Sequence, residues 1–285
     1  MGKILNIKNL NSYCGRFSRE SKKKSPQEII GWYLYSVLME RIPVLVFRVI
    51  DLEDGDTSWP LSWKNGRNFK LAIELTLNML KAWQAYRPEE SKYIIRDLKK
   101  DLPDITLNFR KEMQKFNVKR ARDIIRKRNC DSQEILRIIS ETVGEISSYK
   151  NKQNPMMGSK ILNCFFPEIF PVWDTMWIKN IALKKENLDS VSLENWLPPK
   201  VINILDKNSK ATLEYARYFS LMLKELKNTS DKEYKNIRKV FIRSAEIDEE
   251  IIDNFYYDIG PFLFEFCFLG KYSQSIRKEK RKIRR

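Results

Sequence analysis

The sequence predicts an all-α protein, and two patterns support that prediction. Apolar residues recur every three or four positions through most of the 285 residues, which is typical of amphipathic helices. Proline, serine and aspartate stand where these stretches begin or end, in positions that favour helix starts and stops. Only residues 44–50 resemble a strand, and a buried helix suits them nearly as well.

The expected helices follow one another along the chain. Pro88 and Pro103 would bracket the third helix, because proline interrupts a helix interior. Asp131 or Ser132 would cap the fourth. In chain order, we expect helices at 25–42, 66–86, 89–102, 131–149, 160–166, 175–185, 210–227, 230–245 and 248–266.

The positive charge is concentrated in three segments. The net charge is +16, and residues 1–24, 110–128 and 271–285 together carry 24 Lys/Arg against four Asp/Glu. Because these cations cluster and do not alternate with acids, they favour a polyanionic partner such as nucleic acid. Segment 110–128 would either lie on a helix that follows phosphates or form a solvated face. The last segment is too charged to pack and would form a mobile tail.

Cysteine and histidine usage excludes several classes of protein. There is no histidine, and the four cysteines lie far apart, which rules out a Cys/His zinc site. It also predicts reduced thiols in a cytoplasm. Residues 1–24 do not resemble a signal peptide, and no apolar run reaches the length of a membrane span. We therefore expect a cytoplasmic protein that needs no metal and no other cofactor.

Residues 154–177, NPMMGSKILNCFFPEIFPVWDTMW, contain a glycine shortly before a lysine and then an isolated aspartate among apolar residues. We expect residues 155–158 to form a tight hairpin in which Gly158 takes a positive φ, with Lys160 in the first turn of the next helix. Asp174 would cap the following helix. Backbone N–H groups at a helix start bind phosphate without reading sequence, so this arrangement suits contact with nucleic acid.

This stretch resembles the active-site segment of the helix-hairpin-helix (HhH-GPD) DNA glycosylases, most closely the branch of the 8-oxoguanine glycosylases. Residues 158–160 match the family's Gly-[Ser/Thr]-Lys element. Pro171, Val172 and Asp174 match its Pro-Val-Asp element, with Trp173 inserted. Two features depart from the family pattern: the first glycine of its hairpin is absent, and the helix between lysine and aspartate is shorter.

The resemblance implies a two-lobed all-α fold with the active site in the cleft between the lobes. One lobe would comprise residues 66–183, with the helix-hairpin-helix at about 132–166. The N-terminal segment 1–65 would join the second lobe, to which residues 184–270 contribute the C-terminal helices. The basic tail would occupy 271–285.

The resemblance also implies a reaction. Lys160 would attack C1′ of the deoxyribose as a modified base leaves, giving a Schiff base that can go on to nick the strand. Asp174 would stabilise the positive charge that develops on the sugar. The base must first be extruded from the duplex into a pocket, which Trp59, Trp63 and Trp173 are candidates to line. The predicted DNA contacts are Met157, Gly158, Ser159, Arg120 and Lys127.

The expected partner is double-stranded DNA that contains a modified base, bound by a monomer in the cytoplasm at the nucleoid. The base would be an oxidised purine such as 8-oxoguanine, or a hypermodified phage base such as glucosylated hydroxymethylcytosine, removed in antiviral defence. Two other hypotheses stay open. One is a non-catalytic helical DNA-binding module that uses the hairpin for phosphate contacts, and the other is a helical protein whose basic segments bind an acidic partner.

Overall fold

The computed structural model describes residues 3–20, 74, 77, 88–149, 155–173, 210–245, 249 and 258–272. Every regular element in this part of the chain is a helix, which confirms the all-α prediction for these residues. None of these helices is long and apolar enough to cross a membrane. The helices are α1 (Ile7–Glu20), α5 (Pro88–Lys115), α6 (Ala121–Ile124), α7 (Asn129–Ser148), α8 (Pro155–Phe165), α10 (Lys210–Lys227), α11 (Asp231–Ala245) and α13 (Gly260–Lys271).

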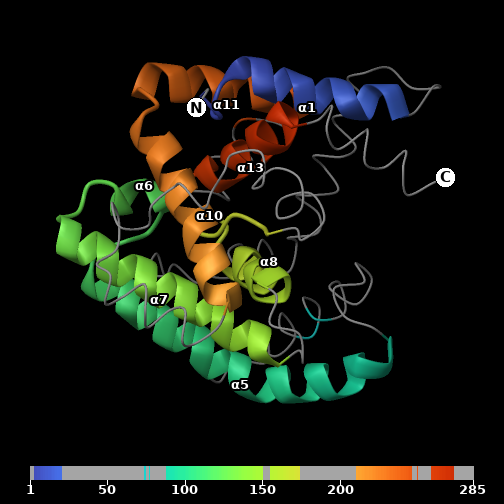
Figure 1. Cartoon of the computed structure of the whole chain (residues 1–285), viewed down its shortest axis with the longest axis vertical. Helices are drawn as coiled ribbons and strands as arrows, with labels where there is room; N and C mark the ends of the chain where they lie inside the picture. The colour runs from blue at the N-terminus through green and yellow to red at the C-terminus, as the bar shows by residue number, and fades with distance from the viewer. Residues whose placement is uncertain are drawn as a thin grey trace.

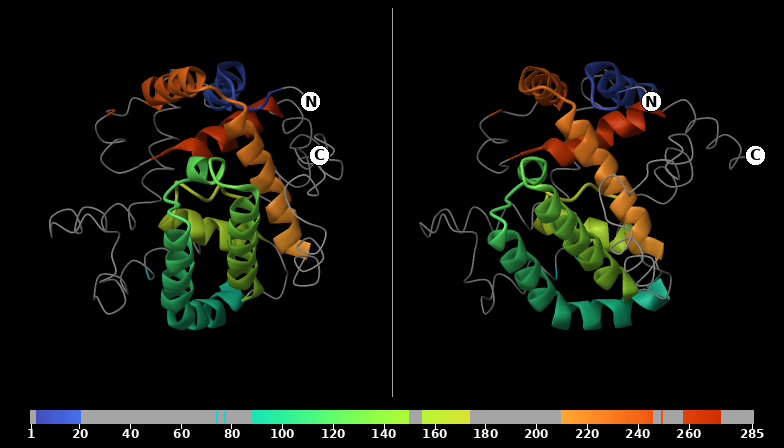
Figure 2. Two further views of the ribbon diagram at one scale, coloured as in Figure 1. Left: turned by 90° about the vertical axis from the view of Figure 1, so that its left-hand side faces the viewer. Right: turned by 60° about the vertical axis from the view of Figure 1, so that its left-hand side comes forward.

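The helices form two groups that α10 connects (Figure 1). At one end α1 and α11 pack together over α13, although α1 comes from the start of the chain and the other two from near its end. At the other end α5 and α7 run antiparallel, and α8 packs against α7 (Figure 2). Helix α10 packs against both groups, because it contacts α6, α7, α8 and α13.

Helix α13 is apolar on all sides and forms the centre of the first group. Its residues from 260 to 270 are buried except for Glu265, which is half-buried. Phe266 stacks on Tyr13 of α1 and on Phe241 of α11, with ring centroids 4.7 and 5.5 Å apart. Two further phenylalanines of α13 pack against Tyr218 of α10. A helix with no polar face needs partners on every side, and these three helices provide them.

The start of α13 differs from the sequence-based prediction of one helix at 248–266. Asp258 and Ile259 are not helical, and the helix begins at Gly260 and continues to Lys271. Pro261 explains the position of the start, because proline lacks an N–H and restricts the residue before it, yet suits the first turn of a helix.

No helix is expected at 7–20 from the sequence, because polar and basic residues outnumber the apolar ones there. The structure forms α1 by packing its buried Leu10 and Tyr13 against the rest of the protein, with α13 as its main neighbour. Gly270 makes this approach possible, since a Cβ at that position would overlap the carbonyl oxygen of Asn9. Tertiary packing therefore stabilises a helix whose apolar residues are few, although Ile7, Leu10 and Tyr13 do recur at helical spacing.

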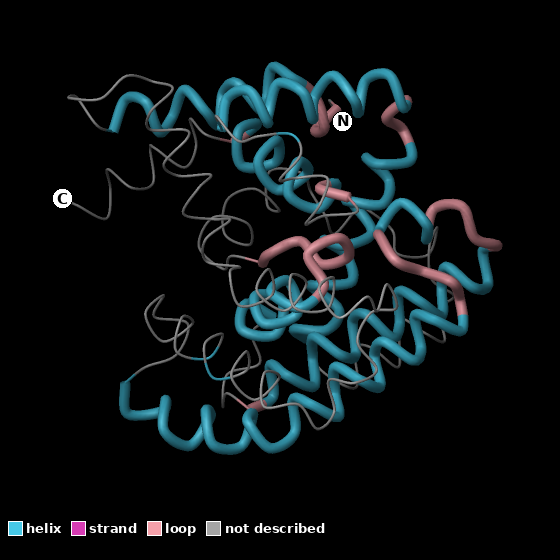
Figure 3. Tube along the Cα trace, turned by 180° about the vertical axis from the view of Figure 1, so that it is seen from behind, coloured by secondary structure: helices cyan, strands magenta, loops and turns pink. Residues whose placement is uncertain are grey.

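Helix α5 is continuous over 28 residues and contains Pro103 in its interior, so the prediction that Pro88 and Pro103 bracket a helix is wrong at the second end. A proline ring crowds the carbonyl four residues earlier, which bends a helix, and α5 is visibly bent in Figure 3. Leu98 and Leu102 before the proline and Phe109 after it are buried. Burial of these residues on both sides of the bend thus stabilises the helix across the proline.

The basic segment 110–128 is not a single helix, so the expected helix is wrong there, while its contact with phosphates stays a prediction. Helix α5 ends at Lys115, and Asn117 turns the chain with a φ of 51°. One helical turn, α6, follows before α7 begins at Asn129. The cations of this segment are therefore spread over the end of one helix, a short turn and the entrance to another.

The predicted cap of the fourth helix, at Asp131 or Ser132, is also wrong. Helix α7 begins earlier, and Arg128 precedes it without a capping hydrogen bond from its side chain. Ser132 Oγ instead donates to the carbonyl oxygen of Ile124, 3.0 Å away, which ties α7 to α6. The hydroxyl thus bonds a carbonyl at the end of α6, and it does not cap the start of α7.

The expected boundaries of α10 and α11 are confirmed to within one residue. The helices expected at 25–42 and 175–185, most of 66–86, and the tail at 273–285 lie outside the described residues. The division into two lobes with a cleft between them stays a prediction.

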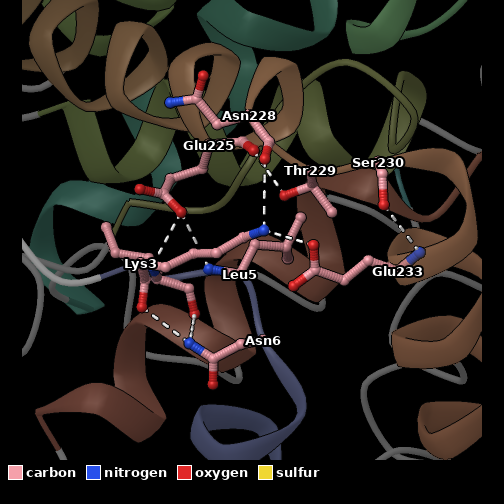
Figure 4. Close-up of polar contacts among 9 residues, drawn as sticks. Lys3, Leu5, Asn6, Glu225, Asn228, Thr229, Ser230 and Glu233 are labelled. Atoms are coloured by element: carbon pink, nitrogen blue, oxygen red, sulfur yellow. Dashed lines mark hydrogen bonds and ion pairs between the residues drawn. The ribbon is translucent and has the colours of Figure 1, made fainter.

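A buried carboxylate holds the N-terminal segment in place. Glu225 of α10 is 8% exposed and accepts the backbone N–H groups of Ile4 at 2.8 Å and Leu5 at 3.1 Å (Figure 4). Lys3 forms an ion pair with Glu233 of α11 and donates to a nearby carbonyl oxygen. These bonds attach the start of the chain to the turn between α10 and α11.

Replacing Glu225 with alanine should destabilise the protein by about 2 to 4 kcal/mol, because two buried backbone N–H groups would lose their acceptor. Urea unfolding measures this change. Lys224→Ala is the matched control, since Lys224 is exposed on the same helix and its loss should cost less than about 0.5 kcal/mol. Equal stabilities for the two variants would show that the carboxylate does not hold the N-terminus.

Candidate functional site

The predicted glycine, serine and lysine all lie within α8, which begins at Pro155. The expected hairpin at 155–158 is therefore wrong, because these residues form the first turn of the helix. The connection between α7 and α8 falls on residues 149–154, of which 150–154 lie outside the described part of the chain. Gly158 lies in a helix and not in a turn, and its φ is not positive.

Gly158 instead allows α8 to touch α7. A Cβ at this position would overlap the carbonyl oxygen of Val143 and come within 2.7 Å of Ser147 Oγ. Ser147 Oγ accepts the backbone N–H of Gly158 at 3.3 Å, so one of the unpaired donors of the helix start is bonded within the protein. The glycine is needed for close packing, and it also sets the position of the next two residues.

Lys160 is the one charged residue of α8. Its side chain is partly exposed, whereas its neighbours Ser159 and Ile161 are fully buried. A mostly buried helix thus carries one partly exposed lysine, two residues after its contact with α7. Packing fixes the backbone of this residue.

Residues 170–173, which lead to Asp174, are held from three sides. Each makes a hydrogen bond through its backbone to a side chain of α8, α10 or α13, so the path of this segment is defined by packed helices. The bonds run from Asn163 Nδ2 to the Phe170 carbonyl, from Tyr215 Oη to the Pro171 carbonyl at 3.0 Å, from Val172 N to Glu265 Oε2 at 3.4 Å, and from Trp173 N to Ser159 Oγ at 3.0 Å.

Ser159 links the two halves of the predicted motif. Its Oγ accepts the backbone N–H of Trp173 and donates to the carbonyl oxygen of Met156 at 3.2 Å. The residue before Lys160 is thus bonded to the residue before Asp174, which itself lies outside the described residues. Because consecutive Cα atoms are about 3.8 Å apart, this hydrogen bond fixes the direct neighbour of Asp174 against α8.

Trp173 is part of the core in this structure. Its side chain is fully buried and packs edge-on against Tyr218, with ring centroids 5.5 Å apart. The prediction that Trp173 lines an open base pocket is therefore not met in this conformation. Trp59 and Trp63 lie outside the described residues.

Glu265 is a residue that sequence reasoning missed. It is the one charged side chain between Gly260 and Gly270, and its carboxylate accepts the N–H of Val172. A lone carboxylate in an apolar helix was the available signal, because a charge is rarely kept in such a place without a partner. Through this bond α13 positions the segment that precedes Asp174.

The predicted DNA contacts occupy two separate places. Met157, Gly158 and Ser159 are buried within α8, and Gly158 lies against α7. Lys127 is half-exposed before the N-terminus of α7, roughly 24 Å along that helix from the contact with Gly158. Arg120 forms an ion pair with Asp123 at 3.1 Å, and its backbone N–H donates to Asp123 Oδ2 at 3.2 Å. Contact of these residues with DNA stays a prediction.

A second polar cluster lies where α6, α11 and α13 meet. Asp258 is 7% exposed, and its Oδ1 accepts the hydroxyl of Tyr234 and the N–H of Gly260. Its Oδ2 is buried and accepts no hydrogen bond from any described residue. Burial raises the pKa of Asp258, although these two hydrogen bonds and the charges of Arg122 and Arg120 lower it. The net effect is a pKa above the ordinary value of an aspartate.

No family model matches the chain, and no curated protein or solved structure matches it significantly. Within the described ranges, no group of Cys, Asp or Glu side chains is arranged to hold a metal ion. The candidate site therefore rests on the geometry around Lys160 and Ser159.

Gly158→Ala should destabilise the protein by about 1 to 3 kcal/mol, because the added methyl group forces α8 away from α7. Gly260→Ala is the control, since its Cβ would meet its nearest neighbours at an ordinary 3.4 Å. Alanine is also favoured over glycine in a helix by about 1 kcal/mol. Thermal or urea unfolding of both variants tests the difference, and equal effects would contradict the close contact.

Asp258→Asn should flatten the pH dependence of stability. The pKa of Asp258 is raised on folding, so its contribution is complete below the unfolded value of about 3.9. It is lost as the pH rises through the higher folded value. We expect the variant to gain stability relative to wild type between acidic and neutral pH, measured by urea unfolding across that range. Asp104→Asn, at an exposed position of α5, serves as the control, and parallel pH profiles for wild type and Asp258→Asn would refute the expectation.

Proposed function

We propose that the protein is a DNA N-glycosylase that removes a damaged or modified base from duplex DNA, with Lys160 as nucleophile and Asp174 as its electrostatic partner. The observation that carries the proposal is the 3.0 Å bond between Trp173 N and Ser159 Oγ. It fixes the residue before the aspartate against the residue before the lysine. In an HhH-GPD active site the lysine and the aspartate must lie close together, whereas a chance match in sequence would not require their neighbours to be in contact.

The proposed chemistry uses the amine of Lys160, a partly exposed residue on a packed helix. The unprotonated amine of Lys160 forms a bond to C1′ of the deoxyribose while the bond from C1′ to the base breaks. The electron pair of the broken bond leaves with the base, which takes up a proton. Loss of a proton from the attached nitrogen and opening of the sugar ring then give a Schiff base. β-Elimination from this intermediate breaks the bond between C3′ and its phosphate oxygen, and water releases the lysine.

Asp174 would act on charge that appears only during the reaction. Positive charge develops on the sugar as the base departs, and a fixed carboxylate stabilises it without reorganisation. The bonds made by segment 170–173 support this role, since they hold the backbone that leads to the aspartate. The net charge of +16 supports a polyanionic substrate. The base is either an oxidised purine such as 8-oxoguanine or a hypermodified phage base.

Borohydride trapping tests this proposal. The protein is incubated with labelled duplexes that carry 8-oxoguanine, glucosylated hydroxymethylcytosine or an abasic site, and the Schiff base is reduced to a stable adduct. We expect an adduct with wild type and with Lys111→Gln, an exposed lysine of α5, and none with Lys160→Gln. Asp174→Asn should keep the amine but slow base release by about 10² to 10³-fold.

The outcomes separate the alternatives. Base release without a trapped adduct would show a glycosylase that uses water, and Lys160 would not be its nucleophile. Duplex binding with neither adduct nor base release would overturn the enzyme in favour of a non-catalytic DNA-binding module. An adduct that persists in Lys160→Gln would place the nucleophile elsewhere in the chain.

A further inference from the structure

The outer face of α11 carries four cations in a row. Lys232, Lys235, Lys239 and Arg243 are exposed and recur every three or four residues, which places them on one side of the helix. The apolar residues of α11 lie on its other side and are buried. None of the four forms an ion pair with any described residue. They span about 16 Å of helix.

A second set of cations lies beside the start of this helix. Lys119, Arg126 and Arg128 are exposed around α6, Lys127 is half-exposed, and none of these has an ion-pair partner in the described part of the chain. We call these four residues and the four of α11 the basic surface. The ion pair between Arg122 and Asp231 places α6 beside the start of α11.

Arg122 of α6 joins the two sets. It forms an ion pair with Asp231, the first residue of α11, and its guanidinium lies over the ring of Tyr234, 4.4 Å from the centroid. The hydrogen bond from Arg122 lowers the pKa of Asp231, and the charges of Arg126 and Lys235 lower it further. Cations of both elements therefore surround this one carboxylate.

The acids in these elements do not neutralise the basic surface. Asp123 is paired with Arg120, Asp231 with Arg122, and Glu233 with a lysine at the N-terminus. Like charges four residues apart in α11 destabilise a helix, and the cations just before the start of α7 oppose the dipole of that helix. The arrangement thus costs folding stability, and a bound polyanion would offset that cost.

We propose that the basic surface binds the backbone phosphates of duplex DNA. A single strand is held largely by stacking of its bases on exposed aromatic rings, and the only large apolar side chains exposed among the described residues are Ile7 and Tyr93, neither of which belongs to this surface. A membrane would require apolar residues beside the cations, and the exposed face of α11 has none. Binding to the phosphates of a duplex requires only cations at the protein surface.

This inference takes its choice of DNA from the proposed function, but it needs no chemistry from Lys160. Along one strand, phosphates follow each other at about 3.4 Å of axial distance, so the face of α11 matches the length of about five phosphates. The surface would hold the duplex without reading its sequence, and the base would be selected elsewhere.

Salt-dependent binding of an unmodified duplex tests the proposal. Fluorescence anisotropy of a short labelled duplex is measured for wild type and Lys235→Gln/Lys239→Gln from about 50 to 200 mM salt, where each phosphate contact contributes about 0.9 to the slope of log K against log salt. Losing two contacts lowers the slope by about 1.8, so the wild-type affinity should fall about twelvefold more than that of the variant across this range. Lys99→Gln/Lys100→Gln, with two exposed lysines of α5, is the control of equal charge and should match wild type.

Each result decides between the two proposals. If Lys235→Gln/Lys239→Gln keeps the wild-type slope, the basic surface does not bind DNA, while base excision by Lys160 is unaffected. If the slope falls but borohydride traps nothing, the surface stands and the glycosylase does not. An equal loss of affinity in the α5 control would show a general charge effect and overturn the inference. Tight binding of a single strand, with the same loss in the variant, would overturn the choice of duplex.

Discussion

The burial of α13 is the constraint on which the rest of the described structure depends. An all-round apolar helix has no stable place at a protein surface, so other helices must enclose it. One of these is α1, and burying α13 therefore brings the two ends of the chain together. Gly270 allows the closest approach between them. The same helix carries Glu265, whose bond to Val172 extends the effect to the segment that precedes Asp174.

The candidate site and the basic surface place opposite demands on the fold. A nucleophile must be held in one geometry, and the proposed nucleophile Lys160 lies on a helix whose other residues are almost all buried. The proposed phosphate contacts require exposed cations, and those on α11 recur at spacings where like charges repel one another. The protein keeps the two in different regions, so that rigidity near α8 is not weakened by charge repulsion around α11.

Local pattern was a good guide where a helix is regular and amphipathic. The bounds of α10 and α11 follow from apolar periodicity and from Asp231 at a helix start. The same reasoning failed at Pro103, where packing on both sides of a proline outweighs its cost, and at α1, whose stability comes from α13. It also failed at Gly158, because a glycine needed for a turn and one needed for close contact look alike in a sequence.

By itself the sequence determined the helical class, the excess of positive charge and the order of glycine, lysine and aspartate in residues 154–177. These depend on composition and on neighbours within a few positions, which a single chain displays directly. Only the tertiary structure decided that Gly158 packs against Val143, that Ser159 holds Trp173, and that Arg122 joins α6 to α11. Such contacts join residues that are distant along the chain. They depend on how whole helices pack, and local periodicity carries no information about that packing.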